Sequence, residues 1–208
     1  MEFYKIESWA IGGQKYPWSS SYGPLDDMPF HRWMTPKIRS QKEEFWKLNP
    51  RPPGMNIDPG GRQWSDIIGN GGMVPFFFVS DKVVNDLRES GVEIMRATEM
   101  PIATIKAKRL QSILPPKYFV LEAHPGIDVD WTAMGVPTDN NNRAITNPYP
   151  TPWPPKQWIV ARSSWSGSDL MSYRNWQIPM TLVCTEKIKK LAEEKNWTNI
   201  KFTPIESS

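Results

Sequence analysis

Apolar and polar positions follow the same order in two stretches of the chain, residues 76–92 and 181–197. Each stretch opens with a short apolar run, which favours a buried strand. Ser80 in the first stretch and Thr185 in the second come next, and their hydroxyls can cap the N-terminus of a helix. An acidic residue follows each cap, where the helix dipole favours a carboxylate. Both stretches therefore predict a strand that leads directly into a capped helix.

The residues after each cap have helical spacing. Gly91 and Asn196 then tolerate the left-handed conformation that often ends a helix. Extended stretches, residues 92–97 and 197–202, are expected to follow. The apolar stripes that we expect to be buried are Val83, Val84 and Leu87 in the first helix, and Ile188, Leu191 and Ala192 in the second.

The whole pattern predicts an α+β fold. Two similar strand–helix–strand units, about 76–97 and 181–202, are expected in a loop-rich domain with mixed sheets and few short helices. Two capped helices can arise independently, but agreement of caps, charges and stops in one register favours a duplication or a shared requirement of the fold. A chain of 208 residues suits one compact domain, within which 1–131 and 132–208 are candidate sub-domains.

Composition narrows the classes of function. The chain has no apolar run near the roughly 20 residues of a membrane helix, and its first residues do not resemble a signal peptide. The single cysteine, Cys184, allows neither an intrachain disulfide nor a cysteine-rich zinc site. The net charge of +3 is small, and its Lys and Arg residues are spread among acids. We expect a cytoplasmic protein that binds neither membrane nor nucleic acid.

Tryptophan is unusually frequent, with 11 residues that lie mostly in Pro-, Gly- and Ser-rich sequence. One interpretation is that these side chains plug loops onto the core. The other is that some are exposed anchors for a partner, because Trp, Tyr and Arg are enriched at binding hot spots. The residues that we predict for partner binding lie in irregular segments: Trp131, Trp153, Trp165, Tyr173, Arg174 and Trp176.

Candidate chemistry is sparse. Glu122, His124, Asp128 and Asp130 are metal-ligand types, but their spacing matches no strong signature and suits turn residues equally well. Cys184 ends an apolar run just before a helix cap, which favours a buried structural thiol. Two histidines in the whole chain leave little for acid–base catalysis. We predict no catalytic residues, no metal and no cofactor.

Several segments, taken in order, resemble a family of bacterial immunity proteins of myxobacterial type, the double-CxxCG family. The run from Phe76 to Gly91 is similar to a segment of that family, and so is the Pro-Pro-Lys-Tyr-Phe-Val-Leu-Glu run at 115–122. Gly126 to Trp131, Cys184 to Ile205 and the start Met-Glu-Phe-Tyr-Lys are similar too. The resemblance implies a small cytoplasmic protein that binds a toxin and neutralises it by direct, stoichiometric complex formation.

The chain departs from the family in one respect. Both CxxCG motifs, which look like metal-binding knuckles, are missing, so metal binding cannot be carried over. Two other hypotheses stay open beside the immunity protein. One is a glycan- or peptide-binding module with exposed Trp faces and no catalysis, and the other is a metal-dependent enzyme built on the acid and histidine cluster at 122–130.

Overall fold

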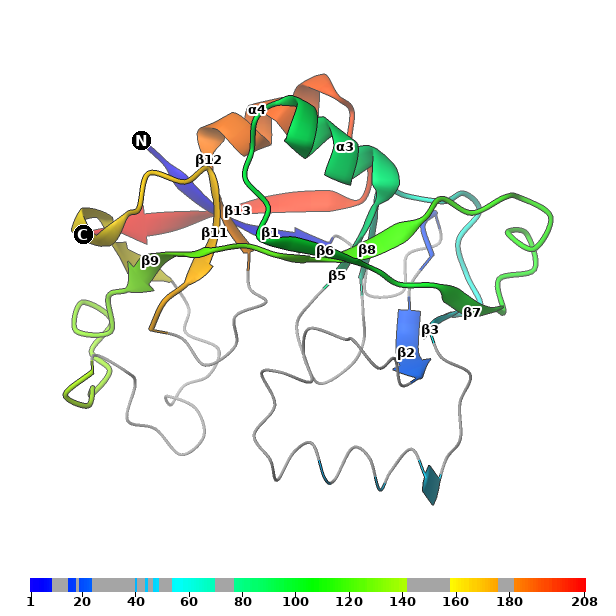
Figure 1. Cartoon of the computed structure of the whole chain (residues 1–208), viewed down its shortest axis with the longest axis horizontal. Helices are drawn as coiled ribbons and strands as arrows, with labels where there is room; N and C mark the ends of the chain where they lie inside the picture. Colours follow the sequence, from blue (N-terminus) through cyan, green and yellow to red (C-terminus); the bar gives the residue numbers. More distant parts are fainter. Residues whose placement is uncertain are drawn as a thin grey trace.

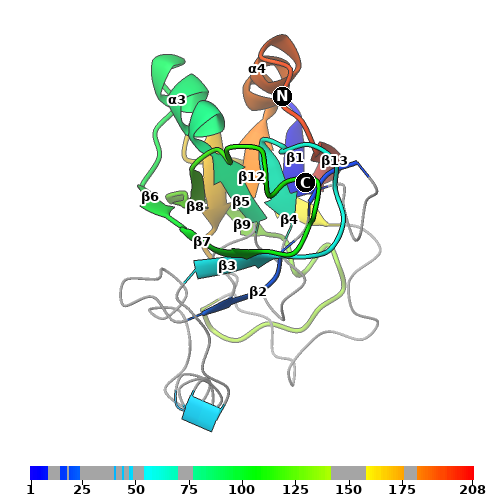
Figure 2. The ribbon, with the colours of Figure 1, turned by 90° about the vertical axis from the view of Figure 1, so that its right-hand side faces the viewer.

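The computed structural model describes residues 1–8, 15–17, 19–23, 40, 44, 47–48, 54–69, 77–141, 158–175 and 182–208, and of residues 20–23 and 77 only the backbone. Within these ranges the protein has a mixed α+β fold, as predicted, with its strands in a closed barrel and two further sheets. The helices α3 (Asp81–Glu89) and α4 (Glu186–Glu194) lie together on one side of the strands (Figure 1 and Figure 2). Neither helix is long and apolar enough to cross a membrane, and the same holds for every helix in the described ranges.

The closed barrel lies toward the end of the molecule where both chain termini are found (Figure 1). Its strands follow the order β1-β12-β11-β9-β10-β13. Strand β1 pairs antiparallel with β12 on one side and β13 on the other, so the barrel joins the first residues of the chain to the last. The strands are β1 (Phe3–Ser8), β9 (Pro125–Val129), β10 (Ile159–Ala161), β11 (Leu170–Tyr173), β12 (Leu182–Thr185) and β13 (Ile200–Ser207).

The other two sheets extend away from the barrel. One has the order β4-β5-β8-β6, with β5 and β6 antiparallel to the strand β8 between them. The other has the order β2-β3-β7 and lies at the far end of the molecule (Figure 1). Their strands are β2 (Ser19–Gly23), β3 (Gly54–Ile57), β4 (Ile67–Gly69), β5 (Phe77–Ser80), β6 (Arg96–Glu99), β7 (Ile102–Ile105) and β8 (Tyr118–Glu122).

Both helices begin at the predicted N-caps, but only one hydroxyl accepts a capping bond. Ser80 Oγ accepts from the N–H of Val83 at 3.4 Å, whereas the Thr185 side chain makes no such bond. Each cap also donates to an aspartate: Ser80 to Asp66 through its N–H (2.7 Å to the carbonyl) and its hydroxyl (3.1 Å to Oδ1). Thr185 donates to Asp169 in the same two ways, at 3.0 Å and 2.8 Å. Asp66 directly precedes β4 and Asp169 directly precedes β11, so the aspartates anchor the helix starts to these neighbouring strands.

The helix ends agree with each other more closely. Gly91 and Asn196 have positive φ angles of 69° and 53°, as the left-handed helix stop requires. The N–H of the next residue, Val92 or Trp197, donates back to a carbonyl of the last helical turns at 2.9 Å. The extended stretches expected from Val92 and Trp197 therefore begin later than predicted, at β6 and β13, because both residues still close the helix and pack into the core.

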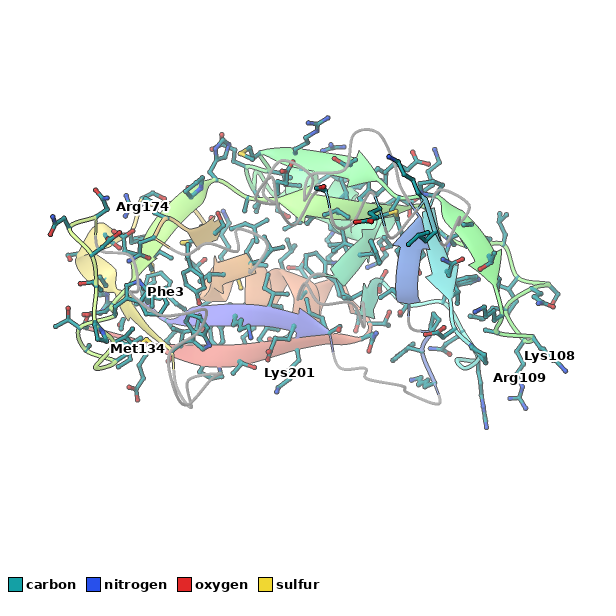
Figure 3. The ribbon with its side chains drawn as sticks, turned by 90° about the horizontal axis from the view of Figure 1, so that it is seen from below. Phe3, Lys108, Arg109, Met134, Arg174 and Lys201 are labelled. Carbon is teal, nitrogen blue, oxygen red and sulfur yellow. The ribbon has the colours of Figure 1, made fainter. Side chains whose placement is uncertain are left out.

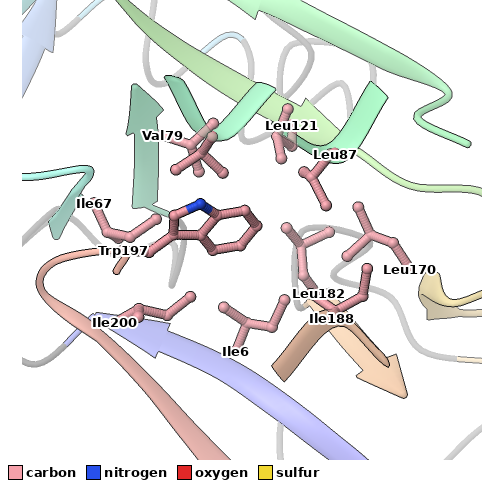
Figure 4. A pocket seen from close by; sticks show the side chains of 11 residues that line it. Ile6, Ile67, Val79, Leu87, Leu121, Leu170, Leu182, Ile188, Trp197 and Ile200 are labelled. Carbon is pink, nitrogen blue, oxygen red and sulfur yellow. The ribbon is translucent and has the colours of Figure 1, made fainter. Parts of the chain in front are cut away.

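One apolar core lies beneath the two helices. The predicted helix stripes are confirmed as buried. Figure 4 shows the Trp197 indole among aliphatic side chains from the four-stranded sheet and from the barrel, including Ile67 of β4, Val79 of β5, Leu170 of β11 and Ile200 of β13. The gap left between them is about 10 Å³, no more than a water-sized void. This region is packed core and offers no ligand pocket.

Polar contacts across this core fix the two helix-bearing parts to each other. The Trp197 indole N–H donates to Asp86 Oδ2 of α3 at 2.7 Å. Asp66 Oδ2 accepts from both the N–H and the hydroxyl of Thr198, each at 2.8 Å. Lys82 Nζ donates to the carbonyl of Lys195 at 2.8 Å. Hydrogen bonds to a carboxylate are strong, so these contacts set the position of one helix against the other.

Candidate partner-binding surface

The structure describes four of the six residues predicted for partner binding. Trp153 and Trp176 lie outside the described residues. The other four belong to the barrel: Trp131 follows β9, Trp165 follows the 3₁₀ turn η1 (Arg162–Ser164), and Tyr173 ends β11 just before Arg174. The barrel therefore brings these four into one part of the molecule.

Trp131 and Tyr173 are core residues, which corrects the expectation that they are exposed anchors for a partner. Trp131 has no exposed surface and packs against Trp158 with ring centroids 6.1 Å apart. Tyr173 is 2% exposed and stacks on the same Trp158 at 5.5 Å. Burial also raises the pKa of the Tyr173 hydroxyl. Both side chains fill the interior of the barrel. For Trp131 this agrees with the first interpretation of the tryptophan content, in which these side chains pack loops onto the core.

Arg174 lies at the surface and is held in place by three hydrogen bonds. Its backbone N–H donates to the carbonyl of Ile127 at 2.9 Å, which extends the pairing of β11 with β9. Its Nε donates to Asp128 Oδ1 at 3.2 Å, and a terminal nitrogen donates to the carbonyl of Ser164. The side chain still exposes 40% of its surface. The guanidinium is therefore oriented in advance, with donors left over for a partner.

Trp165 stands next to this arginine site and is half-buried. Its ring packs against the ring of Phe3 in β1 in a T-shaped contact, with the centroids 6.0 Å apart. Its indole N–H donates to the carbonyl of Ser168 at 2.9 Å. Both contacts are made inside the protein, so they hold the half-buried ring in one orientation.

The turn η1 supports both side chains. Ser164 Oγ donates to the carbonyl of Ala161 at 2.6 Å and accepts from the N–H of Asp128 at 2.8 Å. The N–H of Ser166 donates to the carbonyl of Gly126 at 2.8 Å. A Cβ on Gly126 would lie 2.7 Å from the Met171 Cβ, so only glycine lets the strand approach this closely. We call Asp128, Ser164, Trp165 and Arg174 the barrel-end surface; Figure 3 shows Arg174 at this end of the molecule.

The four residues considered for a metal site are engaged separately. Glu122 is buried in β8, and His124 Nε2 lies 3.1 Å from Glu93 Oε1. Asp130 accepts from the Ser208 hydroxyl at 2.6 Å and from the N–H of Ala133 at 2.9 Å. These donors lower the pKa of the Asp130 carboxyl. In the part of the chain that the structure describes, no three His, Cys, Asp or Glu side chains are placed to hold a metal ion.

The cysteine also has a structural position. Cys184 lies in β12, has no exposed surface and forms no disulfide. Burial raises the pKa of its thiol, with Asp169 adding to the effect. The complete burial of Cys184 confirms the prediction of a buried thiol.

Sequence reasoning missed the two residues that orient Arg174. The sequence suggested Asp128 only as a metal ligand or a turn residue, and it did not single out Ser164. A signal for Asp128 was present, because it stands between Ile127 and Val129, whose apolar side chains point inward from β9. No comparable pattern marks Ser164, whose role depends on pairing between distant segments.

Comparison with known proteins gives no further guide. No protein-family model matches the chain, and no curated protein matches it. The resemblance to immunity proteins therefore rests on the quoted segments alone.

Proposed function

We propose that this protein is an immunity protein that binds a bacterial toxin in the cytoplasm and neutralises it through a direct one-to-one complex. The observation that carries the proposal is the barrel-end surface. There an exposed Arg174 is held by Asp128 and the carbonyl of Ser164, beside the half-buried ring of Trp165. No catalytic role is needed for a protein that acts by occupying the toxin.

The physical reason lies in how tight interfaces work. A few Trp, Tyr and Arg side chains carry most of the binding free energy, and rigid ones lose little conformational entropy when the complex forms. Arg174 and Trp165 are both fixed before binding by contacts within the protein. The Arg174–Asp128 pair contributes little to folding because it is partly exposed. Under the proposal, the pair instead holds the Arg174 guanidinium in the orientation that the partner meets.

Co-expression with a toxin encoded by a neighbouring gene tests this function. We expect the wild-type protein to restore growth and to co-purify with the toxin at one-to-one stoichiometry. Arg174→Ala and Trp165→Ala should each weaken the complex about tenfold or more, as hot-spot residues do. Arg88→Ala is the matched control, since Arg88 is an exposed arginine in the last turn of α3.

Two outcomes contradict different parts of the proposal. If the protein neither protects cells nor co-purifies with the toxin, the immunity function is wrong. If the toxin binds but Arg174→Ala and Trp165→Ala behave like Arg88→Ala, the barrel-end surface is not the interface.

We infer in addition that the segments 76–97 and 181–202 are two copies of one unit. The strand pairing supports this. The strands before and after α3 lie on either side of β8, and those before and after α4 lie on either side of β1. Strand β4 is added next to β5, and β11 is added next to β12, each antiparallel.

Corresponding residues also occupy corresponding places. The cap Ser80 lies opposite Tyr118 at the start of β8, and the cap Thr185 lies opposite Phe3 at the start of β1. Further along, Arg96 lies opposite Glu122, and Lys201 lies opposite Glu7. Agreement in capping, pairing and charge at once favours a common origin over coincidence.

A further inference from the structure

A basic groove lies at the end of the molecule away from the barrel. Its volume is about 500 Å³. A glycine-containing loop and the turn after β7 form its walls, and it is lined by Pro59, Gly60, Gly61, Arg62, Lys106, Ala107, Lys108 and Arg109. Its four cationic side chains are exposed, and none of them forms an ion pair with another described residue. Figure 3 shows Lys108 and Arg109 pointing outward at the end opposite Arg174.

The cations are presented by a firmly held backbone. Ala107 and Leu110 are buried in a core cluster under the turn. The N–H of Lys106 donates to the carbonyl of Ile57 at 2.9 Å, and the N–H of Leu110 donates to the carbonyl of Ala107 at 2.9 Å. On the opposite wall, Gly61 has φ +76°, and a Cβ there would lie 2.7 Å from the Pro17 nitrogen. Both walls are therefore held in place by packing and hydrogen bonds within the protein.

Exposed apolar side chains follow the groove in the same loop. Leu114 is 92% exposed and Ile113 is 43% exposed. The loop is not loose at this point, since Trp64 Nε1 donates to the carbonyl of Ile113 at 3.1 Å. The N–H of Ile113 also donates to the carbonyl of Leu110 at 3.0 Å. An exposed leucine on an anchored loop offers a partner an apolar contact whose position is set before binding.

We propose that the groove and this loop form a docking surface for an acidic segment of a partner protein whose carboxylates flank an apolar side chain. The carboxylates pair with Arg62, Lys106, Lys108 and Arg109, and the apolar side chain packs on Leu114. Under the proposed immunity function, on which this identification of the partner rests, the segment belongs to the toxin and lies apart from the part that meets Arg174.

The chemistry favours protein over other anionic partners. Single-stranded nucleic acid is bound by exposed aromatic rings on which bases stack, whereas the exposed apolar residues here are aliphatic. Among the described residues, Trp64 is hydrogen-bonded to this loop, and its ring is half-buried with its N–H engaged. A membrane surface would gain about 1 kcal/mol for each nearby cation, but one projecting leucine gives little insertion.

Fluorescence anisotropy with labelled probes tests the proposal. The main probe is a 14-residue peptide in which glutamates flank two leucines. The comparison probes are a 14-residue polyglutamate, a 20-nucleotide single strand of DNA and vesicles of phosphatidylserine and phosphatidylcholine. We expect the glutamate–leucine peptide to bind about tenfold more tightly than polyglutamate, and its affinity to fall as salt rises.

Matched variants locate the binding. Arg109→Glu should weaken the peptide about tenfold, whereas Arg88→Glu, with the same change of charge on α3, should not. Leu114→Ser should weaken it about fivefold, whereas Leu48→Ser, at another exposed leucine, should not. Equal loss in variant and control, or tighter binding of DNA or vesicles than of the peptide, would overturn the proposal. That failure would leave the toxin complex untouched, because the complex is tested separately through Arg174 and Trp165.

Discussion

The two four-strand segments share a strand order but differ in how they are completed. The segment β4-β5-β8-β6 stays open, with β4 and β6 at its edges. The segment β11-β12-β1-β13 is closed into a barrel by β9 and β10. Both are covered by a helix on the same side and share one core (Figure 2). The strands, helices and core that the two segments share therefore form the structural framework of the protein.

The two surfaces proposed for binding lie outside these shared strands, in elements that are added to one segment and absent from the other. The barrel-end surface depends on β9, on η1 and on the residue after β11. The basic groove depends on the turn after β7 and on the loop after β3. Proteins commonly place binding residues in loops around a rigid core, because loops on a stable scaffold tolerate changes in sequence.

The largest expected effect comes from breaking the core that both segments share. Trp197→Ala should lower the free energy of unfolding by about 3–5 kcal/mol, because a large buried ring is lost and a cavity is left. It also removes a donor from the buried carboxylate of Asp86. Urea unfolding followed by circular dichroism measures the loss. Val92→Ala, at the corresponding place after α3, should cost only about 1.5 kcal/mol, since less apolar volume is removed.

An intermediate effect is expected at the aspartates that anchor the helix starts. Asp66→Ala should cost about 3 kcal/mol and Asp169→Ala about 1.5 kcal/mol, as charged hydrogen bonds of different number are lost. Asp66 accepts from Ser80 and twice from Thr198. Asp169 accepts from Thr185 and from the exposed Lys187. Equal costs in urea unfolding would show that the link to Thr198 adds nothing.

The smallest effect is a pH dependence at Glu7 of β1. Burial alone would raise the pKa of this carboxyl, but hydrogen bonds from Lys5 and Thr203 bring it below its ordinary value of 4.5. A lowered pKa in the folded state stabilises the protein above the ordinary value, and this contribution is lost as the pH falls through the folded value.

Glu7→Gln should therefore cost less than about 1 kcal/mol at neutral pH and make stability fall less steeply between roughly pH 5 and 3. Thermal unfolding over that pH range measures both. An unchanged slope would mean that Glu7 is not ionised more readily in the folded protein.

The helices could be predicted from the sequence because their signals are local. Ser80, Thr185, Gly91 and Asn196 stand within one turn of the helix ends that they set. The strand order could not be predicted in this way. That β1 lies between β12 and β13 depends on pairing between the two ends of the chain, and no short window of sequence reports it.

The binding residues were harder still. Trp131 and Tyr173 look like loop aromatics because the strands around them are short, yet both fill the barrel. Arg174 was found by residue type, but its fixed orientation depends on Asp128 and Ser164, which come from other segments. The groove was missed for the same reason, since Arg62 is brought to Lys106 only by folding.

Hydrogen–deuterium exchange of the protein with and without its toxin tests most directly whether the toxin binds at the barrel-end surface and the basic groove rather than on the two helices. The account predicts slower exchange in the complex at residues 126–130 and 162–174, a second protected stretch at 106–114, and no change in α3 and α4. Protection confined to the two helices, or no protection anywhere, would contradict it.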